Sequence, residues 1–216
     1  MVRKRLMLTP RRAWGSLGLC CCLFYILAGL GSFLSVTRPV AADIMVVEGW
    51  LPDYAMCDAL AEFRTAGYRC ILTSGGPIGD HNMWSAKYKT FAEFAAANLA
   101  AMGLETNHLV CLPAGQVNRD RTFTSALAIR AWMQTNSAVK SLNVYTLGAH
   151  ARRTRLMFQK ALGDNVRVGV FSHPDSDYDP QHWWATSDGF TKVVYEAFAY
   201  VYSRCIFPFL PREKPA

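Results

Sequence analysis

The chain has 216 residues, 51% of them hydrophobic, which is enough for one domain of ordinary size with its own core. Its net charge of +7 suggests a nucleic-acid partner, but six of the 23 basic residues precede the first acidic residue, Asp43. The remainder holds 17 basic and 16 acidic residues, and this near balance argues against nucleic-acid binding. The six are Arg3, Lys4, Arg5, Arg11, Arg12 and Arg38.

An uncharged stretch follows the basic N-terminus. Residues 13–37 contain no charged side chain, and as a helix of about 1.5 Å per residue they would extend roughly 37 Å. The hydrocarbon core of a bilayer is about 30 Å thick, so we expect a transmembrane anchor over 13–37 behind a cytoplasmic basic tail over 1–12. The excess of cations before the stretch predicts that the following domain lies outside the cytoplasm. A signal peptide cleaved after Ala42 is the alternative.

Beyond the anchor, short apolar runs alternate with longer helical stretches. The expected strands are 43–47, 70–73, 109–112, 142–147 and 166–171, and the expected helices are 53–66, 85–102, 122–134, 149–163 and 187–204. Single helices between successive strands predict right-handed crossovers. We therefore expect a Rossmann-like three-layer α/β sandwich over 43–205, with a mainly parallel sheet of about five strands, and a C-terminal tail over 206–216.

Open parallel sheets bind ligands beyond the carboxyl ends of their strands, so the residues at those ends are candidates for a site. Glu48 follows the first strand and is a candidate general base, ligand contact or ion-pair partner of an arginine. Ser74, Gly75 and Gly76 follow the second strand. They form either a turn whose N–H groups approach an anion or a turn with no further role.

Two further segments fall at the same edge. Asp120, Arg121 and Thr122 begin a helix and are either a cap with a solvated charge or part of the site, with Asp120 as a second candidate acid or base. Trp183, in the loop after the last strand, either stacks on a sugar or base or covers the core.

Cations at the start of the fourth domain helix are the most informative feature. His150, Arg152 and Arg153 lie where a helix already carries partial positive charge, so an anion is expected to pair with them and neutralise their charge. A phosphate-bearing ligand is one candidate. The alternative is a structural network with acids of the neighbouring loop, namely Asp175, Asp177 or Asp179.

Other chemistries are not indicated by the sequence. The five histidines show no His-x-x-x-His pair, so no metal site is predicted. No phosphate-binding loop and no glycine-rich dinucleotide fingerprint is present, so the residues themselves predict no cofactor.

Three motifs occur in a fixed order, each directly after a strand or at a helix start: Ser74–Gly76, Arg121-Thr-Phe-Thr-Ser-Ala126 and Gly148-Ala-His-Ala-Arg-Arg153. Together they resemble the SanA/ElyC/YdcF family, a domain of unknown function associated with the bacterial envelope. The resemblance covers roughly residues 43–202. It implies a Rossmann-like domain on the periplasmic side of the inner membrane and a role in cell-envelope or peptidoglycan-related biogenesis. By resemblance alone it also implies S-adenosylmethionine or a nucleotide as a ligand.

The resulting expectation is a membrane-anchored envelope protein that binds a small anionic ligand, such as a nucleotide or a lipid-linked glycan precursor. The alternative is a non-catalytic partner in envelope assembly, in which the same charges form internal salt bridges.

Overall fold

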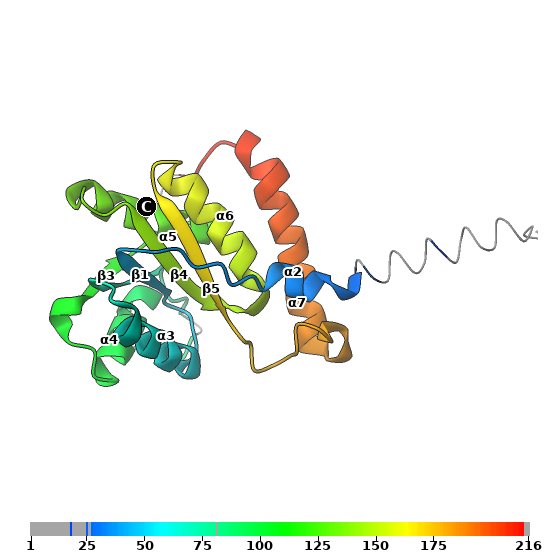
Figure 1. The fold of residues 1–216 in the computed structure, drawn as a ribbon, viewed down its shortest axis with the longest axis horizontal. Helices are drawn as coiled ribbons and strands as arrows, with labels where there is room; N and C mark the ends of the chain where they lie inside the picture. The colour runs from blue at the N-terminus through cyan, green and yellow to red at the C-terminus, as the bar shows by residue number, and fades with distance from the viewer. Residues whose placement is uncertain (1–17, 19–24, 26, 81, 214–216) are drawn as a thin grey trace, which may run out of the picture.

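The computed structural model describes residues 18, 25, 27–80 and 82–213 (Figure 1). Its strands are β1 (Ile44–Glu48), β2 (Ile71–Gly75), β3 (Leu109–Pro113), β4 (Ser141–Leu147) and β5 (Arg167–His173). They form one parallel sheet in the order β3-β2-β1-β4-β5, with Met45 of β1 opposite Ile71 of β2 and Val46 opposite Val144 of β4. The predicted Rossmann-like α/β fold with a five-stranded parallel sheet is confirmed.

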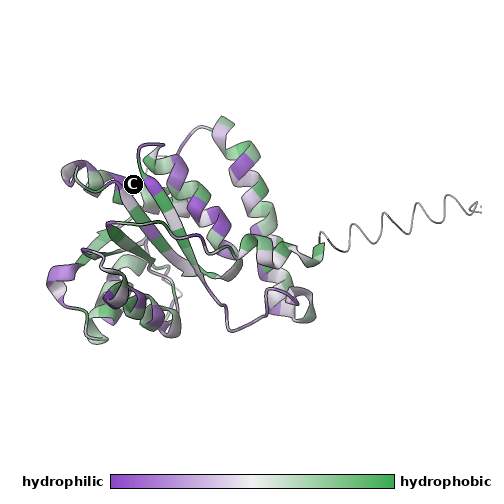
Figure 2. Ribbon diagram, in the orientation of Figure 1, coloured by the Kyte–Doolittle hydropathy of each residue, from purple (hydrophilic) through white to green (hydrophobic). Residues whose placement is uncertain are grey.

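Helices cover both faces of the sheet. They are α2 (Leu30–Leu34), α3 (Asp53–Ala66), α4 (Phe91–Ala101), α5 (Arg121–Thr135), α6 (Ala151–Leu162) and α7 (Ser187–Val201). Alternate residues of β1 point to opposite faces, so Ile44 and Val46 pack toward α5 and α6 while Met45 and Val47 pack toward α3 and α4. Every residue of β1 is buried, and the strand is accordingly hydrophobic along most of its length (Figure 2).

Two helix boundaries differ from the sequence-based prediction. Helix α4 begins at Phe91 and not near Ser85, because Thr90 and Glu93 form a capping box. The Thr90 hydroxyl accepts from the Glu93 N–H at 3.2 Å, and the Glu93 carboxylate accepts from the Thr90 N–H at 3.2 Å. Helix α7 ends at Val201 and continues as a π-helical turn over Tyr202–Ile206.

The predicted basic tail 1–12 and residues 13–17, 19–24 and 26 of the predicted anchor lie outside the described residues. Among the residues that are described, no helix is long and apolar enough to cross a membrane. The last part of the predicted anchor packs on the domain: Leu34 is fully buried in a cluster with Trp183 and Val193. Residues 27–37 therefore belong to the folded domain, which begins before the expected boundary at Asp43.

The start of the predicted C-terminal tail also belongs to the domain. Phe207 is buried, with its ring centroid 4.9 Å from that of Phe123 on α5. Glu213 accepts a hydrogen bond from the backbone N–H of Asn118 at 3.1 Å. Residues 206–213 thus return to the loop before α5 and fix its position.

Replacing Leu34 by alanine should lower the free energy of unfolding of the full-length protein by about 2–5 kcal/mol, because it empties a fully enclosed site. Leu27→Ala is the matched control in the same segment. That side chain is 53% exposed, so the change should stay within about 0.5 kcal/mol. Denaturant unfolding in one detergent measures both, and equal effects would show that α2 is not packed on the domain.

Candidate functional site

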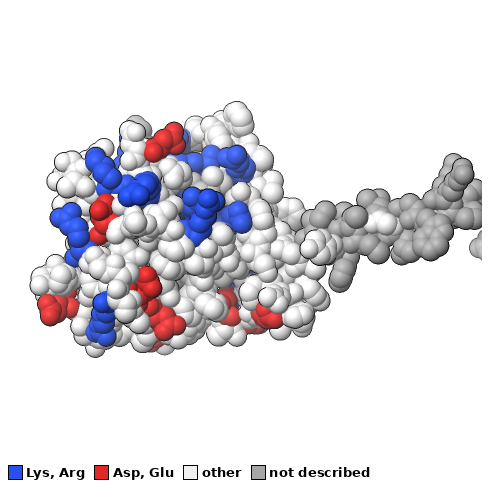
Figure 3. Space-filling model, viewed as in Figure 1, with Lys and Arg blue, Asp and Glu red and all other residues white. Residues whose placement is uncertain are grey.

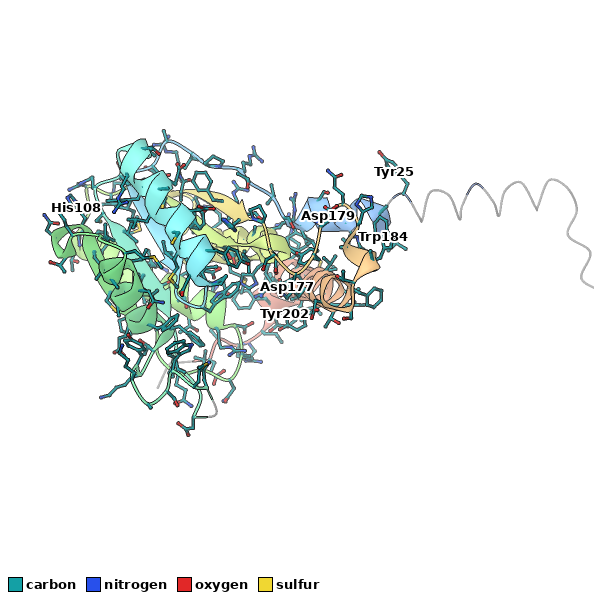
Figure 4. All side chains as sticks on the ribbon, turned by 90° about the horizontal axis from the view of Figure 1, so that it is seen from below. Tyr25, His108, Asp177, Asp179, Trp184 and Tyr202 are labelled. Carbon is teal, nitrogen blue, oxygen red and sulfur yellow. The ribbon has the colours of Figure 1, made fainter. Side chains whose placement is uncertain are left out.

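A cleft of about 700 Å³ opens at the carboxyl edge of the sheet. The chain moves from β1 to β2 on one side and later crosses to β4 on the other, so the strand order reverses at β1, where such sheets bind ligands. Of the residues predicted from the sequence, the cleft brings together Glu48, Ser74, Gly75, Gly76, Asp120, Arg121, Thr122, His150 and Arg153. Helix α7 and the turn after it add Lys192, Glu196 and Tyr202, the last of which is labelled in Figure 4.

Glu196 is the anionic partner of the cations at the start of α6. Its Oε1 lies 2.8 Å from Nδ1 of His150, and its two oxygens accept from Nε and Nη2 of Arg153 at 2.7 and 2.9 Å. Arg153 Nη2 is only 2.9 Å from His150 Nδ1, and the shared carboxylate offsets the repulsion between the two cations. The signal for this residue in the sequence is an acid within an otherwise apolar stretch of the last helix.

The acids expected to fill this role are used elsewhere. Asp175 and Asp177 accept from the ammonium group of Lys192 at 2.8 and 2.6 Å. Asp179 pairs with His182 at 2.7 Å. The predicted pairing of the α6 cations with these aspartates is therefore wrong. The cations instead form a network with Glu196.

Glu48 is held rigidly beside the same cluster. The hydroxyls of Thr146 and Thr154 both donate to its Oε2, the latter at 3.3 Å. The other oxygen, Oε1, lies 3.7 Å from Nε2 of His150. Glu48 is buried. One of its carboxylate oxygens is fixed by the two hydroxyls, and the other faces the imidazole.

His150 is a proton donor in this arrangement. Burial by itself lowers the pKa of His150, but the carboxylates of Glu48 and Glu196 outweigh it and raise that pKa to about 9. Burial raises the pKa of Glu196, whereas the charge of His150 and the hydrogen bonds from Arg153 lower it to about 2. Within the described residues, His150 Nε2 has no hydrogen-bond partner. At neutral pH the imidazole is therefore protonated and does not serve as a base, and its Nε2 faces Oε1 of Glu48.

At the start of α6, the protein itself supplies hydrogen-bond and ion-pair partners. The N–H of Ala149 donates to the hydroxyl of Tyr178 at 2.9 Å, and Glu196 answers the two cations. Tyr178 also lies where a side chain at Gly148, which has a φ of 48°, would project. An anion bound at the N–H groups of this segment would have to displace the tyrosine.

The start of α5 is open instead. Asp120, the residue before the helix, has a left-handed backbone with φ of 57°, and its side chain caps no N–H group of the helix. The first intrahelical bond runs from the N–H of Thr124, so the three preceding N–H groups have no acceptor in the helix. The side chain of Arg121 is exposed and forms no hydrogen bond or ion pair within the described part of the chain. This end of the cleft holds donors without acceptors.

Ser74 and the following glycines face the same end of the cleft. Ser74 is 2% exposed, and its hydroxyl has no hydrogen-bond partner among the described residues. A side chain at Gly75 would come within 2.7 Å of the Cβ of Phe91, so packing of α4 explains that glycine. At Gly76 the nearest atom would be 3.9 Å away, so packing does not explain the second one.

Two residues predicted to bind a ligand do not line the cleft. Arg152 turns to the outer face of α6, where its Nε donates to the Phe33 carbonyl and its guanidinium lies 3.7 Å from the centroid of the Phe33 ring. Figure 3 shows basic side chains gathered on this face. Burial and the neighbouring charges of Arg38 and Arg152 lower the pKa of Arg155 there. Trp183 is buried against Leu34, and its indole N–H donates to the Leu27 carbonyl at 3.2 Å. It covers the core, which was the alternative interpretation.

Within the described residues, no group of three or more His, Cys, Asp or Glu side chains is arranged to hold a metal ion. The sequence matches no protein-family model and no curated protein. The resemblance to the SanA/ElyC/YdcF family therefore rests on its three motifs, and each of the three contributes residues to the one cleft.

The charge of His150 should make the protein's stability depend on pH. Its pKa of about 9 in the folded state exceeds the ordinary value of 6.5, so the stabilisation is complete below pH 6.5 and is lost as the pH rises through 9. The free energy of unfolding should fall across this window by at most about 1.4 kcal/mol per pH unit, the slope for one proton. His150→Asn should remove this component of the slope, and a slope unchanged in the variant would show that His150 is neutral in the folded protein.

Proposed function

We propose that this protein is a membrane-anchored envelope protein of the SanA/ElyC/YdcF type that binds a small phosphate-bearing ligand in the cleft. The single observation that carries the proposal is the open start of α5, where Arg121 and three N–H groups have no acceptor among the described residues, in the cleft that Ser74 also lines. Helix starts with free N–H groups bind phosphate, and a guanidinium adds paired donors.

Phosphate is favoured over a carboxylate by the number and spread of the donors. Donors come from two segments of the cleft wall, the α5 start and the turn after β2. A phosphate group presents three strong acceptor oxygens, whereas a carboxylate presents two in one plane. The cleft volume of about 700 Å³ leaves room for a sugar or nucleoside beside the phosphate.

The amino-acid sequence supports the proposed location of the protein in the cell envelope. The uncharged residues that precede Leu27, behind a basic N-terminus, favour attachment to the bacterial inner membrane, with the domain on the periplasmic side. Envelope or peptidoglycan-related biogenesis follows from the family resemblance, as does S-adenosylmethionine or a nucleotide as an alternative ligand. A lipid-linked glycan precursor combines a phosphate with the membrane and is the first compound to test.

If the bound group reacts, the arrangement assigns roles to two side chains. His150 would donate the proton from Nε2, because it is charged at neutral pH and its other nitrogen is held by Glu196. Glu48, with its free oxygen beside the imidazole, would act as the base in place of His150. Asp120 lines the same cleft and is the second candidate.

A second candidate function is that of a non-catalytic assembly partner. The observation in its favour is the bidentate contact between Arg153 and Glu196, since a cation so fully paired needs no ligand. Among the described residues Arg121 has no hydrogen-bond or ion-pair partner. The ligand-binding function therefore predicts that Arg121→Ala weakens ligand binding, whereas the assembly function predicts no effect on a ligand.

A thermal-shift titration of the full-length protein with inorganic phosphate, nucleotides, phosphorylated sugars, lipid-linked precursors and S-adenosylmethionine tests the proposal. A ligand at 100 times its dissociation constant should stabilise the protein by about 2.7 kcal/mol. Arg121→Ala should weaken binding about tenfold to a hundredfold, because a hydrogen bond to a charged group contributes about 1.5–3 kcal/mol. The unliganded variant should unfold like the parent, since the side chain has no partner in the described structure.

Arg167→Ala is the matched control, because this exposed arginine begins β5 at the opposite, amino-terminal edge of the sheet. It should leave both affinity and stability unchanged. If no phosphate compound shifts the unfolding temperature, or if Arg121→Ala binds as tightly as the parent, the phosphate site is not at the α5 start.

Arg153→Ala tests the structural network itself. Removing the guanidinium leaves the buried Glu196 carboxylate with His150 as its remaining cation, so stability should fall by about 3–5 kcal/mol even without a ligand. Denaturant unfolding of the unliganded variant measures this loss. Unchanged stability would show that the Arg153–Glu196 contact is not part of a structural network.

A further inference from the structure

Helix α7 presents two different faces. One face carries Lys192 and Glu196, the only charged residues between Phe190 and Val201, and both are paired beside the cleft. The opposite face exposes Phe190, Phe198 and Val201, with Tyr195 at its border with the cleft. We call these four residues the apolar ridge.

The apolar ridge is larger than the isolated exposed hydrophobic residues of an ordinary surface. Phe198 is 74% exposed, and the other three members each expose more than half of their surface. Tyr195, Phe198 and Val201 are three residues apart, and Phe190 lies about two helical turns before Phe198, so the four residues lie along one side of the helix. An exposed apolar strip of this kind marks a contact surface for a partner or a membrane, and the exposed Asp188 in the first turn of α7 bounds it at its start.

The described segment from Leu27 to α2 lies next to this helix. Leu27 accepts a hydrogen bond from the indole of Trp183, and α2 packs against α7 through Phe33 and Tyr200, whose ring centroids are 5.9 Å apart. Before Leu27 the sequence carries no charge as far back as Ala13. Figure 1 shows α7 along the edge of the domain on the side where α2 lies.

We propose that the apolar ridge of α7 rests on the surface of a lipid bilayer. A helix with one uncharged aromatic face and one polar face lies in the interface between headgroups and acyl chains. Tyrosine and tryptophan favour this depth, and the exposed Tyr25 and Trp184 lie at the same end of the molecule (Figure 4). The uncharged segment that ends at Leu27 beside α7 favours a membrane over a second protein as the occupant.

This placement has a consequence for the cleft. Tyr195 belongs both to the apolar ridge and to the cleft wall, and Lys192 of α7 and Tyr202 of the following turn line the cleft as well. The mouth of the cleft beside α7 would therefore open at the bilayer surface. The docking itself does not require the phosphate site, because it rests on the other face of the helix.

Photocrosslinking from single positions tests the docking in the full-length protein. The protein is reconstituted into vesicles of phosphatidylcholine and phosphatidylglycerol with p-benzoylphenylalanine replacing Phe190 or Phe198. The probe resembles the aromatic side chain that it replaces, and both positions are exposed, so folding should be retained. We expect lipid adducts, detected by mass spectrometry, at both positions.

Met83 is the matched control position. It is an apolar side chain that is 81% exposed, and it lies in the loop before α4, away from α7. A domain that is merely tethered near the bilayer would label Met83 and Phe198 alike, and this result would overturn the docking. Adducts of Phe198 with a second copy of the chain in place of lipid, or no adducts at all, would overturn it as well.

Discussion

The carboxylate of Glu196 joins segments that are distant in the sequence, and the geometry of the cleft depends on it. It accepts from His150 and Arg153 at the start of α6 while it is itself buried on α7. A buried carboxylate is costly unless it is paired, and two neighbouring, partly buried cations at a helix start are costly as well. Each side of this contact therefore requires the other, and α7 is held against the carboxyl edge of the sheet as a result.

The same contact changes how the cations at the start of α6 are interpreted. His150 and Arg153 look like an anion site in the sequence, yet together with Glu48 and Glu196 they form a cluster of two cations and two acids. The charge of the two cations is largely neutralised by these two acids within the protein. The donors that lack acceptors lie a short way along the cleft, at the start of α5 and at Ser74. The cluster then serves to set the protonation of His150 and the position of α7, and the α5 start is left to meet a ligand.

Helix α7 connects the cleft to the outside of the molecule. Its polar residues complete the cleft wall, and its apolar residues form an exposed ridge beside α2. Docking of this ridge on a bilayer would hold the cleft at a fixed height above the membrane. For a protein proposed to bind a lipid-linked phosphate, such an orientation would shorten the path from the membrane to the site.

The sequence by itself determined the order of strands and helices, the parallel sheet and the edge that carries the polar residues. These follow from local hydrophobic runs and from the rule that crossovers place carboxyl ends together, so Glu48, Ser74, Arg121 and His150 could be assigned to one edge. The start of α4 was also encoded locally, since Thr90 and Glu93 have the spacing of a capping box.

Only the tertiary structure decided which charges meet. Neighbouring residues on a helix point in different directions, so Arg153 enters the cleft while Arg152 turns to Phe33. The choice of Glu196 over Asp175, Asp177 and Asp179 depends on how α7 packs against α6, a contact between segments more than 40 residues apart. The pairing of charges is a property of distances in the folded chain, and no periodicity along the sequence records it.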